Sequence, residues 1–258
     1  MINWGLPNEH HPYSYHPDEA RLLQYMGNMN PFEFDFNPDD MAYPTFHILL
    51  SGAVLLVASW FGVVTISSDP SFYIQHPFEL ASIILVGRLI TVLFSIASIY
   101  VVYRIGMILK NKEAGLIAAF LFSINPLHII ESHYFTLDVP MLFWMLLSAY
   151  ACLYAFKTKK YQYIIWGGAF AGLAASTKYP GGIIILFPFI YNWRLTWDVK
   201  IIFGRLRTLI VPIWTIYLIW AFGWFINGTP YILLEPITFF QNFITTLTTS
   251  SGLGQDTV

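Results

Sequence analysis

The 258-residue chain is 56% hydrophobic and 18% aromatic, and only 11% of its residues are charged. A soluble domain carries about 25% charged residues, so this chain has too little charge to cover a water-facing surface and is predicted to be an integral membrane protein. The net charge of −2 gives no indication of nucleic-acid binding, and a single cysteine, Cys152, excludes a disulfide framework or a cysteine-based metal site.

Residues 1–44 are polar and rich in Asn, His, Pro and acidic residues, which predicts an outer or luminal loop with short helices. Residues 45–66 are apolar, but polar residues interrupt them and the run ends in Trp60-Phe61. This composition is typical of a helix that lies in the membrane interface or re-enters it. The length would also allow residues 45–66 to span the membrane.

Six further apolar runs lie between residues 82 and 226. A helix needs ~20 residues to cross the hydrocarbon core of a membrane, and the length of each run is judged against this number. We predict that residues 82–226 form a transmembrane bundle of about six helices, followed by a truncated outer loop over residues 227–258. We also expect a further transmembrane helix before residue 1, since no hydrophobic segment precedes the polar head to carry it across. The runs are about 82–107, 114–132, 139–156, 162–178, 181–197 and 206–226.

Three clusters between these runs contain 10 of the 13 basic residues. Cytoplasmic loops collect Lys and Arg, so we place the clusters in the cytoplasm and residues 132–138 and 178–181 on the outer or luminal side. The clusters are Arg104, Lys110 and Lys112; Lys157, Lys159 and Lys160; and Arg194, Lys200, Arg205 and Arg207.

Short motifs follow one another along residues 4–200. They are Asp18-Glu19, Tyr43-Pro44-Thr45-Phe46, Gly87-Arg88-Leu89, Tyr103-Arg104-Ile105-Gly106, Ser123-Ile124-Asn125-Pro126, Leu137-Asp138-Val139-Pro140 and Ser176-Thr177-Lys178-Tyr179. In this order and spacing, the chain resembles the GT-C membrane glycosyltransferases, most closely glycosyltransferase family 39. That family includes the dolichyl-phosphate-mannose protein mannosyltransferases and the bacterial transferases that put aminoarabinose on lipid A. The resemblance implies an all-α, polytopic transmembrane helical bundle of the GT-C type.

The resemblance also implies that Asp18, Glu19 and Asp138 are catalytic. Family members place their catalytic aspartate at the position of Asp18, which would take the proton of the acceptor hydroxyl. Glu19 would position the acceptor or share that role, and Asp138 would be the second acid of the same site. Without the resemblance, Asp18 and Asp138 are also residues that favour the start of a helix, and for Asp138 the two roles are compatible.

Arg88 and Lys178 lie outside the basic clusters, near the outer ends of predicted spanning runs. A charge inside hydrocarbon costs ~3 kcal/mol or more, so such residues are functional or extend to the lipid headgroups. We predict that both bind the phosphate of the lipid carrier. His128 and His133 with Glu131 could bind a divalent cation, but their spacing is not the i, i+4 pattern of helical zinc sites; we predict no metal ligand and no certain cofactor.

Together these features predict an enzyme that moves a monosaccharide from a polyprenyl- or dolichyl-phosphate donor to a hydroxyl of a protein, lipid or glycan acceptor. The active site would face the outer or luminal side of the plasma membrane or the endoplasmic reticulum. A lipid-linked sugar transporter (flippase) is an alternative, but it would bury its ionisable residues near the bilayer midplane, whereas here they lie at the outer edge. An inactive, truncated relative is a third interpretation.

Overall fold

The computed structural model describes residues 2–30, 33, 35–39, 42–160, 162–196 and 206–250, except the side chains of 192–196, 206–213, 243 and 246–250. In the described residues the regular structure is helical, apart from two isolated β-bridges. The all-helical prediction is therefore confirmed for this part of the chain.

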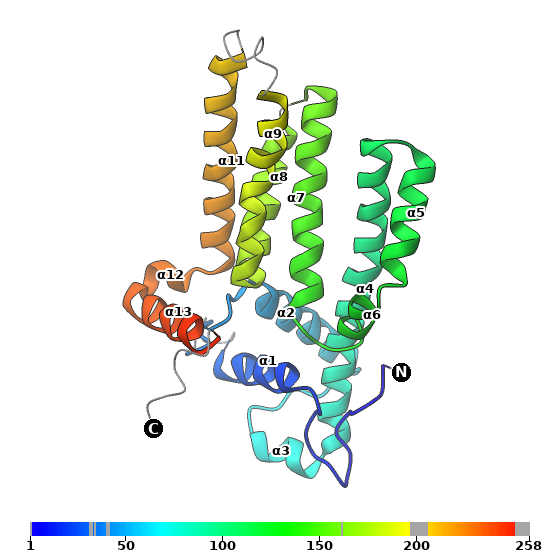
Figure 1. Cartoon of the computed structure of the whole chain (residues 1–258). Coiled ribbons are helices and arrows are strands. Elements are labelled where there is room, and N and C mark those ends of the chain that lie inside the picture. The colour runs from blue at the N-terminus through cyan, green and yellow to red at the C-terminus, as the bar shows by residue number, and fades with distance from the viewer. Residues whose placement is uncertain are drawn as a thin grey trace.

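A bundle of roughly parallel and antiparallel helices forms the body of the molecule (Figure 1). Two of its described helices, α4 and α7, are long and apolar enough to cross a membrane. With 33 residues, α4 is about 50 Å long and exceeds the ~30 Å hydrocarbon core. The bundle contains α4 (Pro77–Leu109), α5 (Lys112–Ser123), α7 (Asp138–Thr158), α8 (Tyr163–Thr177), the 3₁₀ helix η2 (Tyr179–Leu186), α9 (Phe187–Thr196) and α11 (Leu206–Gly228).

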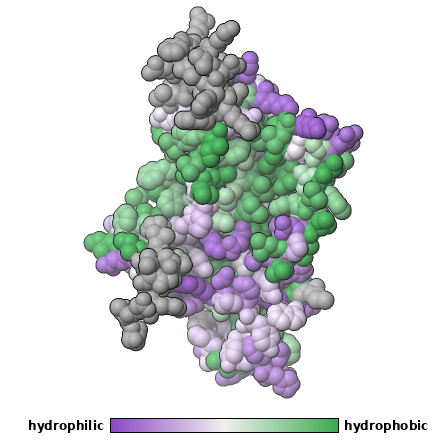
Figure 2. All heavy atoms as spheres, viewed as in Figure 1, coloured by the Kyte–Doolittle hydropathy of each residue, from purple (hydrophilic) through white to green (hydrophobic). Residues whose placement is uncertain are grey.

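Shorter helices gather at one end of the bundle, which we call the site end (lower in Figure 1). The 15 residues of α2 measure about 22 Å, less than the thickness of the hydrocarbon core. On the face drawn in Figure 2, apolar side chains cover the middle of the bundle, and more hydrophilic residues lie toward the site end. The helices there are α1 (Pro17–Asn28), α2 (Phe46–Trp60), α3 (Pro70–Gln75), α6 (Pro126–Glu131), α12 (Tyr231–Leu234) and α13 (Pro236–Ser250).

Helix α8 lies between α7 and α11, and small residues allow the close approach. A Cβ atom at Gly168 would meet the Tyr217 carbonyl oxygen, and one at Gly172 would meet the Ala221 carbonyl oxygen. Dispersion contacts between closely packed backbones stabilise helix pairs in membranes, where the hydrophobic effect between helices is weak.

Two of the apolar runs differ in detail from the prediction. The run 114–132 is divided into α5 and α6, because the Asn125 side chain accepts hydrogen bonds from the backbone N–H groups of Leu127 and His128 and so begins a new helix. Pro126 follows as the first residue of α6, a position where its missing N–H costs nothing. The run 181–197 begins as the 3₁₀ helix η2 before it continues as α9.

The first two basic clusters lie at the end of the bundle opposite the site end, where α4 and α7 finish (Figure 1). In the third cluster, Lys200 and Arg205 lie outside the described residues, as do the side chains of Arg194 and Arg207. The predicted outer loop 227–258 contains α12 and α13, and its residues 251–258 also lie outside the described residues.

Candidate functional site

The acidic pair opens helix α1, where Pro17 is the first residue and Asp18 and Glu19 occupy the first turn. Carboxylates in this position are stabilised by the positive end of the helix dipole. Glu19 shares the buried face of α1 with Leu22 and Tyr25, whereas Asp18 remains partly exposed. Adjacent residues of a helix point about 100° apart, so the two carboxylates have different surroundings.

Glu19 is fully buried and forms a bidentate ion pair with Arg88 of α4. The Arg88 Nε atom lies 2.7 Å from Glu19 Oε1, and Nη2 lies 2.8 Å from Oε2. Oε1 also accepts a hydrogen bond of 2.8 Å from the backbone N–H of Phe135, and Oε2 accepts one from the Ser14 hydroxyl. One carboxylate thus joins α1, α4 and the loop between α6 and α7.

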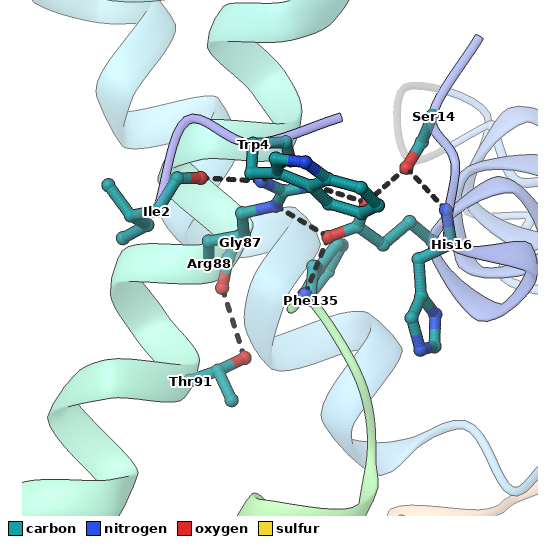
Figure 3. Close-up of polar contacts among 9 residues, drawn as sticks. Ile2, Trp4, Ser14, His16, Gly87, Arg88, Thr91 and Phe135 are labelled. Atoms are coloured by element: carbon teal, nitrogen blue, oxygen red, sulfur yellow. Dashed lines mark hydrogen bonds and ion pairs between the residues drawn. The ribbon is translucent and has the colours of Figure 1, made fainter. Parts of the chain in front are cut away.

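The rest of the Arg88 guanidinium binds the N-terminal segment (Figure 3). Its Nη1 atom donates to the carbonyl oxygens of Ile2 and Trp4, the latter at 2.8 Å, and the group also lies over the Tyr134 ring. Every guanidinium nitrogen therefore has a protein partner, and the side chain is only 1% exposed. To contact a ligand phosphate, Arg88 would have to exchange one of these partners.

Gly87 allows the loop to approach α4 this closely. A Cβ atom at this position would lie 2.5 Å from ring atoms of Phe135, whose side chain is fully buried. Gly87 and Arg88 therefore both support the contact between α4 and the α6–α7 loop. Gly87 leaves space for the Phe135 ring, and Arg88 binds the Glu19 carboxylate that accepts the Phe135 N–H.

A second ion pair joins Asp138, the first residue of α7, to Lys178, which directly follows α8. The Lys178 Nζ atom lies 2.8 Å from Asp138 Oδ1 and 2.7 Å from Oδ2. Both side chains remain partly exposed, at 22% for Lys178 and 37% for Asp138. Lys178 Nζ also lies 5.9 Å from the centre of the Tyr43 ring. Unlike the Glu19–Arg88 pair, this pair is accessible to a ligand.

Glu131, at the end of α6, connects these groups electrostatically. Burial raises the pKa of its carboxyl, and the Asp138 and Asp18 carboxylates raise it further, whereas His16 and Lys178 lower it. These four groups are therefore close enough to Glu131 for their charges to act on it. In the sequence, Glu131 suggests only a metal partner for His128 and His133. The signal for its place near the acidic residues of the site is its position seven residues before Asp138.

The histidines near Glu131 have other partners. His128 Nε2 lies 2.8 Å from the Ser95 hydroxyl oxygen, and His133 Nδ1 contacts the Ile129 carbonyl oxygen. No group of three or more His, Cys, Asp or Glu side chains suited to a metal ion is found in the described part of the chain.

The structure thus places the five predicted site residues at the same end of the bundle, and four of them form two separate ion pairs. Glu19 and Arg88 form a buried pair, and Asp138 and Lys178 form a partly exposed pair. Asp18, at the start of α1, contributes a negative charge that raises the pKa of Glu131.

Comparison with known families decides the class of protein. A profile of the dolichyl-phosphate-mannose-protein mannosyltransferases matches residues 78–220, just over half of the chain. The chain belongs to this family. Searches among curated proteins and among solved structures gave no significant match.

Family membership identifies the chain as a glycosyltransferase-family domain with the membrane fold of the GT-C class. The matched region contains Arg88, Glu131, Asp138 and Lys178, whereas Asp18 and Glu19 precede it. Two long apolar helices and the family together indicate an integral membrane protein, as the low charge content predicted. The catalytic and phosphate-binding roles of the individual residues stay predictions.

Proposed function

We propose that this family member transfers a monosaccharide, mannose in the first instance, from a dolichyl- or polyprenyl-phosphate carrier to an acceptor hydroxyl on the outer or luminal side of a membrane. The family's own description supports the donor and a protein acceptor. The observation that carries the proposal is that acidic and basic residues from α1, α6, α7 and the end of α8 meet at one end of a mannosyltransferase-family bundle.

In the proposed reaction, the acceptor hydroxyl oxygen attacks the anomeric carbon of the sugar. The bond between that carbon and the phosphate oxygen breaks, and its electron pair leaves with the phosphate. A carboxylate takes the hydroxyl proton. Asp18 is our candidate for this base, because it is partly exposed and no described residue forms an ion pair with it.

Lys178 is the candidate for stabilising the phosphate, since its ammonium group is partly exposed and is held in place by Asp138. A cation at the leaving oxygen stabilises the charge that develops in the transition state. Asp138 then has a positioning role toward Lys178, and it keeps the ammonium group at the rim before the donor binds.

Glu19 and Arg88 are proposed to position Asp18. The bidentate pair fixes the first turn of α1 against α4 and the loop before α7, and Asp18 precedes Glu19 directly. A base acts efficiently only when it is held within hydrogen-bond distance of the proton it accepts. The phosphate contact predicted for Arg88 would add to this role if the donor displaces the Ile2 or Trp4 carbonyl oxygen.

For the membrane, we propose that the site end faces the outer or luminal side and that α2 lies in the interface. The exposed Trp60 and Phe61 at the end of α2 suit this position. Single cysteines at His10 and Lys159 in a Cys152→Ser background test it: a membrane-impermeant maleimide added to sealed, right-side-out vesicles should label the first and not the second. Labelling of both from the same side would contradict the proposed placement.

The function is tested with the purified full chain in liposomes, supplied with radiolabelled dolichyl-phosphate-mannose and serine- or threonine-containing acceptor peptides. We expect transfer by the wild-type protein and its loss in Asp18→Asn, with unchanged expression and thermal stability. Full transfer by Asp18→Asn would overturn the assignment of the base. Absence of transfer by the wild type with mannosyl, glucosyl and aminoarabinosyl donors would overturn the proposed function.

A further inference from the structure

A groove with an almost entirely apolar lining lies between α4 and α7, toward the end of the bundle opposite the site end. Its volume is about 250 Å³. The two helices line it with residues at the same spacing, i, i+4 and i+7, which places each set on one face of its helix. These residues are Ala97, Val101 and Arg104 of α4 and Phe143, Leu147 and Tyr150 of α7.

Arg104 is held between the two helices at one end of the groove. Its Nη1 atom donates a hydrogen bond of 2.9 Å to the Tyr100 hydroxyl, and Nη2 donates one of 2.7 Å to the Tyr150 hydroxyl on α7. The Arg104 Cζ atom lies 5.7 Å from the centre of the Tyr100 ring and 5.3 Å from that of Tyr150. The guanidinium group therefore turns toward α7 and the groove instead of extending past the end of α4 into water.

The depth of this group corresponds to the headgroup region of a bilayer. Arg104 precedes Leu109, the last residue of α4, by about 7.5 Å, and Tyr150 precedes Thr158, the last residue of α7, by about 12 Å. Tyrosine and arginine side chains favour this interfacial depth. The apolar part of the groove runs from there toward the middle of the bundle, so a polar group at Arg104 and a hydrocarbon chain in the groove can belong to one molecule.

The charge at this end of the bundle favours an anion. No acidic side chain of the described residues forms an ion pair with Arg104. Both tyrosine hydroxyls accept a hydrogen bond from Arg104, and neither donates its own proton to a described residue. One guanidinium and two phenolic O–H groups can thus bind the same phosphate. Two basic clusters surround them, and Glu113 is the one acidic residue within 104–113 and 157–160.

We propose that this groove binds an anionic phospholipid of the cytoplasmic leaflet, with its phosphate on Arg104, Tyr100 and Tyr150 and one acyl chain along the apolar lining. The cytoplasmic leaflet contains anionic lipids, and basic pockets between transmembrane helices on that side bind their headgroups. The inference does not depend on the transfer reaction, and only the choice of leaflet depends on the orientation proposed above. The bound lipid links α4 to α7 and stabilises the bundle.

The sugar donor occupies a different place. Asp138 is the first residue of α7, and Tyr150 follows it by 12 residues, or about 18 Å along the helix. A phosphate held by the Asp138–Lys178 pair therefore cannot be the phosphate that contacts Arg104, and the two lipids can be bound together.

The experiment uses the purified full chain in a non-ionic detergent and measures lipid binding by native mass spectrometry and by the rise in melting temperature. We expect dioleoyl-phosphatidylglycerol to bind tightly with one molecule per chain and to raise the melting temperature. Zwitterionic dioleoyl-phosphatidylcholine should bind more weakly. Glycerol 3-phosphate, which has the phosphate without the acyl chains, should give no stabilisation.

Two variants test the two halves of the groove. Arg104→Met removes the charge and should raise the Kd for phosphatidylglycerol roughly tenfold, the loss of a charged hydrogen-bond donor. Ala97→Leu fills the apolar part and should weaken binding of the lipid while Arg104 is retained. Lys112→Gln, at the exposed start of α5, is the matched control and should keep the Kd within about twofold of the wild type. Each variant is compared with and without lipid, so a loss of stability is separated from a loss of binding.

An unchanged Kd for phosphatidylglycerol in Arg104→Met would overturn the inference. Equal losses in Arg104→Met and Lys112→Gln would also overturn it, because they would show attraction to the general surface charge. The same holds for equal binding of the two phospholipids or for full stabilisation by glycerol 3-phosphate. Sugar transfer by the wild type tests the proposed function independently of each of these outcomes.

Discussion

Replacing Glu19 by glutamine removes one charge from the buried pair while keeping the side-chain shape. The amide oxygen of the new side chain could still accept the Phe135 N–H, so the change isolates the interaction with the guanidinium. Arg88, which is 1% exposed, would remain charged and buried with only carbonyl oxygens and an aromatic ring around it.

Removing one partner of a buried ion pair costs about 3–5 kcal/mol, because the other charge stays desolvated without compensation. For a chain of this size, 1 kcal/mol shifts the melting temperature by roughly 2–4 °C. We therefore expect Glu19→Gln to lower the melting temperature by roughly 6–20 °C. The rate of sugar transfer should also fall at temperatures where the variant is still folded, because the first turn of α1, and Asp18 with it, is no longer held in place.

Cys152 provides the assay. It is the single cysteine of the sequence and is fully buried in α7, so a fluorogenic maleimide reacts with it only when the bundle opens. Heating the detergent-solubilised protein with this dye gives the melting temperature of each variant. Asp18→Asn is the matched control on α1, since Asp18 has no ion-pair partner among the described residues and its replacement should leave the melting temperature within about 2 °C.

A double-mutant cycle decides whether the pair itself carries the effect. Arg88→Met removes the other charge, and the double variant Glu19→Gln/Arg88→Met leaves no buried charge uncompensated. The double variant should be more stable than the sum of the single effects predicts, by at least about 1 kcal/mol. Additive effects, or a Glu19→Gln melting temperature equal to that of the wild type, would refute the reasoning.

The remaining predictions use the same liposome and thermal assays. Lys178→Met breaks a partly exposed pair worth about 0.2–1 kcal/mol, so the melting temperature should fall by no more than about 4 °C while transfer falls at least tenfold; retained transfer would contradict a phosphate-binding role. Gly172→Ala places a Cβ atom against the Ala221 carbonyl oxygen and should destabilise the bundle by about 1–3 kcal/mol. Gly223→Ala, whose added carbon would meet no atom within 4 Å beyond its chain neighbours and its own helix backbone, should be neutral or slightly stabilising. Equal effects of the two glycine variants would show that the α8–α11 contact is not tight.

Much of the architecture can be predicted from the hydrophobicity and the charge distribution of the sequence. A span was expected over 82–107, and α4 covers Pro77–Leu109, because apolar length alone determines where a helix can cross hydrocarbon. The break at Asn125-Pro126 also has a signal in the sequence, a capping residue followed by a proline, but hydrophobicity alone does not reveal it because the run 114–132 is apolar on both sides of the break.

The sequence likewise contained a signal for the orientation of Glu19. Leu22 and Tyr25 follow it at helical spacing, so a periodicity argument places Glu19 on the apolar face of α1 and leaves Asp18 outside that face. A carboxylate on such a face requires a cationic partner, but the periodicity does not say which one.

Only the tertiary structure decides which acidic side chain pairs with which basic side chain. Glu19 and Arg88 are 69 residues apart, and Asp138 and Lys178 are 40 residues apart, so no local spacing relates them. The sequence by itself determined a helical membrane protein, because the free energy of transferring each residue into lipid decides which segments can cross the membrane. It also marked one end of the bundle, because Lys and Arg collect in cytoplasmic loops. Packing between α1, α4 and the α6–α7 loop decided which charges are buried against each other and which remain open to a ligand, because burial depends on contacts between segments that are distant in the chain.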